Sequence, residues 1–180
     1  KEIGTTCMHH RLTHEAVKVF RGIMDEVCPE GRIITETNVP HKDNISYFGN
    51  GTDESHMVYQ FSLPMLVLYS FYKQNAERLS EWAESLRLPS EKASFFNFLA
   101  SHDGIGINPV RNLIPGEDLQ HLLEHLEEKC GALISYKRNP DGSDSAYEVN
   151  VSYFNAVGET YDFEIAKRRF ITAHAVLLAM

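Results

Sequence analysis

Three short runs of β-favouring residues, separated by helical stretches, constrain the fold of this 180-residue chain more than any other feature. The runs are Arg32–Glu36, Met57–Phe61 and Phe95–Ala100. Apolar strands that alternate with amphipathic helices favour βαβ units, in which a parallel sheet is buried on both faces. The pattern therefore predicts an α/β fold.

The helical stretches carry apolar residues at helical spacing. Thr13 is the predicted N-cap of the first helix. Pro64 favours the start of a second helical stretch. Residues Met65 to Leu86 are predicted to form one long helix or two short ones. Pro115 is expected to open an amphipathic helix, and a last helix is expected from about Phe163 to the chain end. The faces expected to be apolar are formed by Leu79, Trp82, Ala83 and Leu86, and by Leu119, Leu122, Leu123 and Leu126.

The length of the chain limits how much of a parallel barrel it can form. A complete (β/α)8 barrel needs about 250 residues, whereas this chain has 180 and only three clear strand-like runs. The chain opens with Lys1 and has no initiating Met, and its last apolar stretch lacks a helix stop signal. We therefore expect a fragment: a partial (β/α)8 TIM barrel that forms one domain over residues 1–180 and is incomplete at both ends.

Composition excludes several classes of partner. The net charge of −8 argues against binding to nucleic acid or to an anionic membrane, since both need a basic surface. No stretch reaches the roughly 20 apolar residues of a membrane span, and no signal peptide is recognisable. Cys7, Cys28 and Cys130 form no CxxC pair, which fits a reducing compartment. We expect a cytoplasmic protein; its oligomeric state is not predicted.

Two polar clusters stand directly after strand-like runs. Glu36 begins the first cluster, and His102 and Asp103 form the second. The carboxyl ends of parallel strands are where active sites assemble in such folds. A carboxyl group at each of two strand ends suits glycosidic bond chemistry, in which one group protonates the leaving oxygen and others stabilise the charge on the sugar. Spacing alone equally allows these carboxylates to cap helices or to pair with surface lysines.

Other candidate sites are weaker. His10 and His14 stand four residues apart, but the predicted start of the helix at Thr13 leaves His10 outside it, so we expect no metal site. The glycines at 104 and 106 are expected to let the backbone turn after Asp103 rather than to bind phosphate. The three cysteines are expected to be ordinary packing residues.

Several longer motifs resemble one known family. The segment Phe98–Gly106 is similar to the end of the seventh barrel strand of the α-amylase superfamily, in the form found in sucrose phosphorylases, and Thr35–His41 is similar to that family's fifth strand. The segments Asn44–Gly51, Val58–Pro64 and Tyr147–Asn150 look like the same group. The resemblance covers the whole chain and is strongest to the glucosylglycerate phosphorylase branch. It implies a barrel segment from after the fourth strand through the helix after the seventh.

The resemblance also implies roles for individual residues. Glu36 would be the general acid/base, and Asp103 with His102 would hold sugar hydroxyls and stabilise the transition state. The acceptor or phosphate would be contacted by Asn38, Tyr147 and Glu148. The nucleophilic aspartate would lie a few residues before Lys1, so these 180 residues alone are expected to be inactive. The substrates implied are a small carbohydrate and inorganic phosphate, with no metal and no organic cofactor.

The expected activity of the parent enzyme is retaining α-glucosyl transfer to phosphate by double displacement. Two alternatives stay open: an α-glucosidase or transglucosidase on the same scaffold, and a non-catalytic carbohydrate-binding fragment. The segment Asp144–Glu148 departs from the pattern associated with sucrose-specific relatives, and Asn38 stands where those enzymes tend to carry a histidine. We therefore expect an acceptor such as glycerate rather than fructose, with Arg111, Lys137 and Arg138 as available cations.

Overall fold

The computed structural model describes residues 9–160 and 162–180, so Cys7 lies outside the described residues. The chain divides into two compact units. The first unit comprises Lys1–Gln60 and Arg87–Phe96, and the second comprises Phe61–Leu86 and Asn97–Met180. That the whole chain forms one barrel domain stays a prediction.

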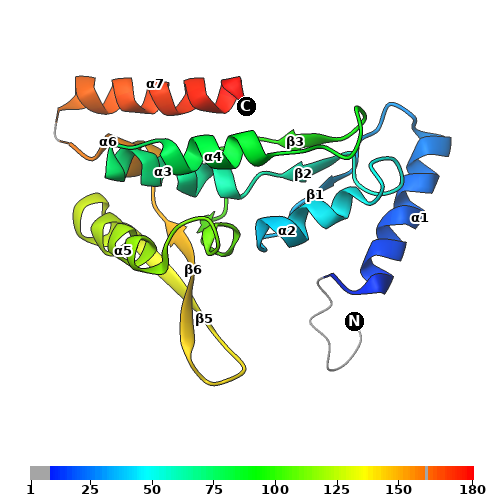
Figure 1. Cartoon of the computed structure of the whole chain (residues 1–180), viewed down its shortest axis with the longest axis horizontal. Coiled ribbons are helices and arrows are strands. Elements are labelled where there is room, and N and C mark those ends of the chain that lie inside the picture. The colour runs from blue at the N-terminus through cyan, green and yellow to red at the C-terminus, as the bar shows by residue number, and fades with distance from the viewer. Residues whose placement is uncertain (1–8, 161) are drawn as a thin grey trace. The chain divides into compact units, whose positions relative to one another are not determined.

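A parallel sheet of three strands lies at the centre of the first unit (Figure 1). Its order is β1 (Ile34–Thr35), β2 (Met57–Tyr59) and β3 (Ser94–Phe96), and both strand pairs are parallel. The three strand-like runs of the sequence are thus confirmed as neighbouring parallel strands, each shorter than predicted. Val58 of β2 is fully buried and packs with Tyr47 and Phe48.

Three helical segments complete the first unit. They are α1 (Arg11–Val27), the short α2 (His41–Asn44) and the 3₁₀ turn η1 (Ile45–Phe48). The predicted N-cap at Thr13 is wrong, because α1 begins earlier and the Nδ1 atom of His10 accepts the hydrogen bond of the Leu12 amide. The ring of His10 thereby satisfies one of the amides that a helix N-terminus leaves without a partner.

The second unit is mainly helical. The stretch after β2 forms two helices, α3 (Ser62–Lys73) and α4 (Glu77–Ser85), because Gln74 takes a left-handed conformation with φ 52° and ends α3. Helix α5 (Gly116–Cys130) follows Pro115 and buries the predicted leucine face. The unit ends with α6 (Tyr153–Gly158) and the predicted last helix, α7 (Phe163–Ala179). In the described part of the chain no helix is long and apolar enough to cross a membrane.

An antiparallel sheet in the second unit was not predicted. It has the order β4–β6–β5, with β4 (Ile105–Gly106), β5 (Leu133–Arg138) and β6 (Asp144–Asn150). Strands β5 and β6 form a hairpin whose turn is residues 139–143 (Figure 1). Tyr147 and Glu148 lie on the second strand of this hairpin.

Candidate active site

Glu36 directly follows β1, and its side chain is exposed to solvent. The register of the parallel sheet pairs Thr35 with Val58 and Tyr59 with Phe96. Glu36 lies one residue beyond the end of β1, and Tyr59 and Phe96 are the last residues of β2 and β3. The rings of Tyr59 and Phe96 pack together, with centroids 4.8 Å apart. Glu36 thus stands exposed at the same end of the parallel sheet as these two rings.

The segment after Glu36 is tied to its surroundings by buried polar contacts. Thr37 donates its hydroxyl to Oδ1 of Asn44, at 2.8 Å. Asn44, which is 2% exposed, donates Nδ2 to the carbonyl oxygen of Tyr59, at 2.7 Å. Asn38 is half-buried, and its Oδ1 atom is enclosed without a hydrogen-bond partner among the described residues. Enclosed polar atoms are normally paired, so this oxygen is an exception among the described residues.

His41 lies close behind the same strand ends. Burial holds the pKa of its ring below the usual value, and a hydrogen bond with Gln60 works in the opposite direction. A lowered pKa keeps the imidazole neutral near pH 7. Its ring also packs against Phe95, at a centroid distance of 6.1 Å. His41 therefore belongs to the buried layer of this unit.

In the second unit, His102 and Asp103 lie in the bend before β4. Their side chains are 82% and 57% exposed, and His102 Nε2 stands 3.6 Å from Asp103 Oδ1. The amide of Asp103 donates to the hydroxyl oxygen of Ser101, at 3.2 Å. An exposed carboxylate next to an imidazole can accept hydrogen bonds from sugar hydroxyl groups, which fits the predicted role.

Strand pairing brings the Asp103 segment against β6. Ile105 pairs with Val149, and Gly106 pairs with Glu148. A Cβ atom on Gly104 would meet Asn150 Oδ1 at 2.8 Å and Glu148 Cβ at 3.0 Å. Gly104 was expected to allow a turn of the backbone, but its φ is not positive. Instead, a glycine is needed here because the backbone lies close to β6. Asp103 and Glu148, which the sequence separates by more than 40 residues, belong to neighbouring segments.

Tyr147 and the cations around it line the hairpin. Lys137 Nζ stands 5.5 Å from the centre of the Tyr147 ring. Arg138 Nη1 stands 3.5 Å from Asp144 Oδ2. Arg111 donates to the carbonyl oxygen of Ala146, so its guanidinium supports β6 from the neighbouring turn. The structure thus gathers His102, Asp103, Tyr147 and Glu148 in the second unit and places Glu36 and Asn38 in the first.

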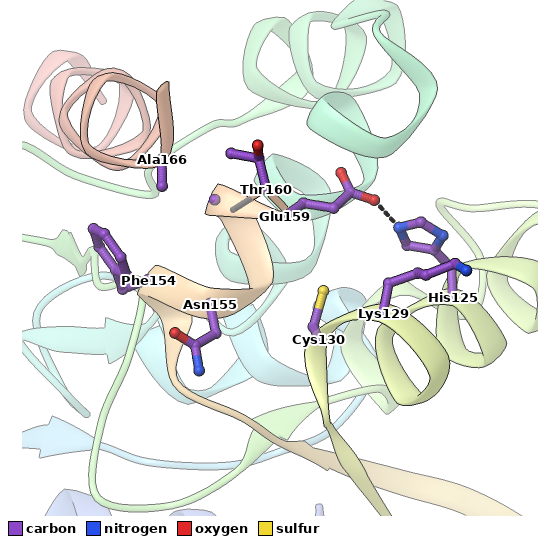
Figure 2. A pocket seen from close by; sticks show the side chains of 9 residues that line it. His125, Lys129, Cys130, Phe154, Asn155, Glu159, Thr160 and Ala166 are labelled. Atoms are coloured by element: carbon purple, nitrogen blue, oxygen red, sulfur yellow. Dashed lines mark ion pairs between the residues drawn. The ribbon is translucent and has the colours of Figure 1, made fainter. Parts of the chain in front are cut away.

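A pocket of about 500 Å³ in the second unit was not anticipated from the sequence. Figure 2 shows that residues of α5, α6 and the start of α7 line it. His125 and Glu159 form an ion pair at its side, and Glu159 also approaches Arg169 Nη1, at 3.5 Å. Burial first, and then the charge of Glu159, raise the pKa of the Cys130 thiol. Since the thiolate is the reactive form, this cysteine is unsuited to nucleophilic chemistry.

His14 has a structural partner. Its Nδ1 atom lies 2.7 Å from Oε2 of Glu54, and its ring stacks on Tyr47, with centroids 4.6 Å apart. His10 caps α1 instead of facing a metal. In residues 9–160 and 162–180, no three side chains of the His, Cys, Asp and Glu types gather closely enough to hold a metal ion.

The chain is similar in sequence to sugar phosphorylases, although no protein-family model matches it. It is 56% identical over 181 residues to glucosylglycerate phosphorylase of Escherichia coli (strain K12), a match that covers 99% of this chain and 32% of that protein. It is 49% identical over 181 residues to glucosylglycerate phosphorylase of Spirochaeta thermophila, covering 100% of this chain and 30% of that protein. The chain therefore spans about a third of the length of these relatives.

The fold has a counterpart among solved structures. The crystal structure of sucrose 6F-phosphate phosphorylase from Thermoanaerobacter thermosaccharolyticum matches with a TM-score of 0.78 at 20% sequence identity. The match covers 98% of this chain and 34% of that chain. Together with the three parallel strands, it confirms the predicted partial barrel, since the described strands form no closed sheet. Along nearly its whole length, this chain is homologous to about a third of the glucosylglycerate phosphorylases.

Proposed function

We propose that these residues carry the acid/base part of a retaining sugar phosphorylase, which transfers an α-glucosyl group to inorganic phosphate. The observation that carries the proposal is the 56% identity to a glucosylglycerate phosphorylase over the whole chain. The exposed Glu36 at the end of a parallel strand is in keeping with it, because a general acid must reach the leaving oxygen.

The proposed reaction proceeds by two displacements. In the first, a carboxylate nucleophile at the fourth strand of the complete barrel attacks the anomeric carbon. Glu36 gives its proton to the oxygen of the departing acceptor, so that bond breaks and a covalent β-glucosyl ester forms. In the second, phosphate attacks the anomeric carbon and Glu36 takes a proton back. The carboxylate leaves, and α-glucose 1-phosphate is released with net retention.

The residues of the second unit supply binding and charge stabilisation in this scheme. Asp103 and His102 bind hydroxyl groups of the glucosyl unit, and the carboxylate stabilises the positive charge that develops on the ring. Tyr147 and Glu148 on β6 contact the acceptor or phosphate. Asn38 adds its unpaired Oδ1 from the first unit. No step uses a metal or an organic cofactor.

A glycerate-like acceptor is the proposed specificity. The two relatives reported above are named for glucosylglycerate, and cationic side chains are available on the hairpin. A carboxylate acceptor needs such partners to offset its lost hydration. Lys137 beside the Tyr147 ring is the best placed, because Arg138 is close to Asp144 and Arg111 is engaged with Ala146. The carboxylate of Glu148 would repel an acidic acceptor unless the two negative charges are kept apart.

The test uses the full-length protein that contains these residues. Incubation with glucose 1-phosphate and either glycerate or fructose should release phosphate faster with glycerate. Faster phosphate release with fructose would refute the proposed acceptor, but the proposed reaction class would stand. Glucose release that is independent of phosphate would identify a hydrolase. Failure of a fluorinated glucosyl donor to form a covalent adduct would favour a binding protein.

A further inference from the structure

A buried asparagine joins the strand end that carries Glu36 to the neighbouring strand. Asn44 ends the short helix α2, and the Asn44 amide donates to the carbonyl oxygen of Pro40, at 3.0 Å. Its side chain uses both of its ends, accepting from the Thr37 hydroxyl at 2.8 Å and donating to the Tyr59 carbonyl at 2.7 Å. Thr37 directly follows Glu36, and Tyr59 ends β2. The contact therefore joins the end of β1, which carries the proposed acid, to the end of β2.

The surroundings make this bridge rigid. Asn44 is 2% exposed and Val39 is 4% exposed, so water has little access to the segment. The Val39 amide donates to the Thr37 carbonyl oxygen, at 3.0 Å, which fixes the backbone of Thr37 from a second side. Both hydrogen bonds of the Asn44 side chain are partly buried, and a polar group that loses its partner in such a place is costly.

We propose that Asn44 and Thr37 are positioning residues for Glu36. Their hydrogen bonds set where the Glu36 backbone stands beyond the end of β1, and hence where its carboxyl group meets the leaving oxygen. This inference rests on the proposed function, because it takes Glu36 to be the general acid. Neither residue touches substrate; both act through Glu36.

A positioning role has a kinetic signature that a merely structural role lacks. A misplaced acid slows donors whose leaving group needs a proton and spares donors whose leaving group departs as a stable anion. A general weakening of the fold lowers turnover of both donors in proportion to the amount of folded enzyme. The ratio of the turnover rates with the two donors therefore reports the position of Glu36 separately from the amount of folded enzyme.

The matched pair of variants is Thr37→Val and Thr52→Val. Both replace a threonine whose hydroxyl donates to an asparagine Oδ1 at 2.8 Å, but Thr52 bonds to Asn50 in the exposed loop before β2. Valine keeps the shape of threonine and removes only the hydroxyl. Thr37→Ser restores the hydroxyl and serves as the conservative rescue.

The experiment measures kcat and KM of the full-length enzyme with glucosylglycerate and with α-glucosyl fluoride, following glucose 1-phosphate and fluoride release. For Thr37→Val we expect kcat with glucosylglycerate to fall about 10- to 100-fold, the scale of a slightly misplaced catalytic group. The initial burst of fluoride release, which reports the first displacement alone, and both KM values should change little. Thr52→Val should match the wild type, and Thr37→Ser should recover most of the loss.

Two outcomes would overturn the inference alone. One is a Thr37→Val enzyme that behaves like Thr52→Val, and the other is an equal loss with both donors. If the wild-type enzyme turns over neither donor in the presence of phosphate, the proposed function fails and this inference fails with it.

Discussion

Adding a single methyl group at Gly104 should displace Asp103 and slow every glucosyl transfer. The Cβ atom of Gly104→Ala would stand 2.8 Å from Asn150 Oδ1 and 3.0 Å from Glu148 Cβ. The amide of Asn150 is not free to yield, because Nδ2 donates to the Leu133 carbonyl at 3.2 Å and to the Ser135 hydroxyl at 2.9 Å. The backbone of the 103–104 segment must therefore move.

The size of the effect follows from this geometry. Overpacking of a well-packed site costs about 1–3 kcal/mol of stability. A shift of Asp103 on the order of 1 Å would lower kcat by about 100-fold. Because the carboxylate of Asp103 is proposed to stabilise the charged sugar in each displacement, activated and unactivated donors should lose rate alike.

The assay compares Gly104→Ala with Gly116→Ala in the full-length enzyme. Gly116 is the first residue of α5, and a Cβ atom there would meet nothing within 4 Å. Its replacement should leave kcat unchanged. The double variant Gly104→Ala/Asn150→Ala removes one of the two close contacts and should recover part of the rate. Equal kcat values for Gly104→Ala and Gly116→Ala would refute the argument that β6 fixes the position of Asp103.

Three further predictions concern charge and completeness. In the full-length enzyme, Glu36→Gln should lower kcat with glucosylglycerate by at least about 100-fold more than kcat with α-glucosyl fluoride. Asp103→Asn should lower kcat with both donors. The same dependence on the leaving group in the two variants would contradict the assigned roles. Hydrogen bonds from Tyr69, at 2.6 Å, and Lys73, at 3.0 Å, hold the pKa of Asp118 below its usual value. The stability they give is present above about pH 4, the ordinary range of an unfolded Asp, and is lost as the pH falls through the lowered folded pKa. The difference in Tm between the wild type and Asp118→Asn should therefore shrink at acid pH, and a constant difference would refute the pairing. The 180-residue chain expressed alone should bind a hydrophobic dye and form no glucose 1-phosphate, since α1 exposes apolar side chains such as Phe20, at 63%, and Val27, at 75%; glucose 1-phosphate from a clean preparation would overturn this.

The parallel sheet could be predicted because apolar, β-favouring runs mark its strands. The runs around Val58 and Phe95 are apolar over several residues, and helical stretches separate them, so the order of the strands along the chain was readable. The antiparallel hairpin could not be predicted in the same way. Strand β5 is mostly exposed on both faces and thus shows no apolar alternation.

The sequence signal for the candidate residues was a polar cluster after an apolar run. Glu36 directly follows β1, as the sequence predicts, whereas the third run forms a strand only as far as Phe96 and Asp103 lies in the bend before β4. The bridge through Asn44 left no such signal, because its partners lie 7 and 15 residues away and meet it only in the fold. The start of α1 at His10 was missed for a related reason, since histidine is not a common N-cap.

The two groups of proposed site residues are held by different means, and this difference bears on how acceptor specificity can change. Glu36 follows a strand of a parallel sheet, and its neighbour Thr37 is tied to the buried Asn44. Tyr147 and Glu148 lie on a strand of a largely exposed hairpin. Substitutions on an exposed hairpin cost little stability, whereas substitutions around a buried hydrogen bond cost more. The hairpin is therefore the part of the site in which a new acceptor can be accommodated while the acid stays in place.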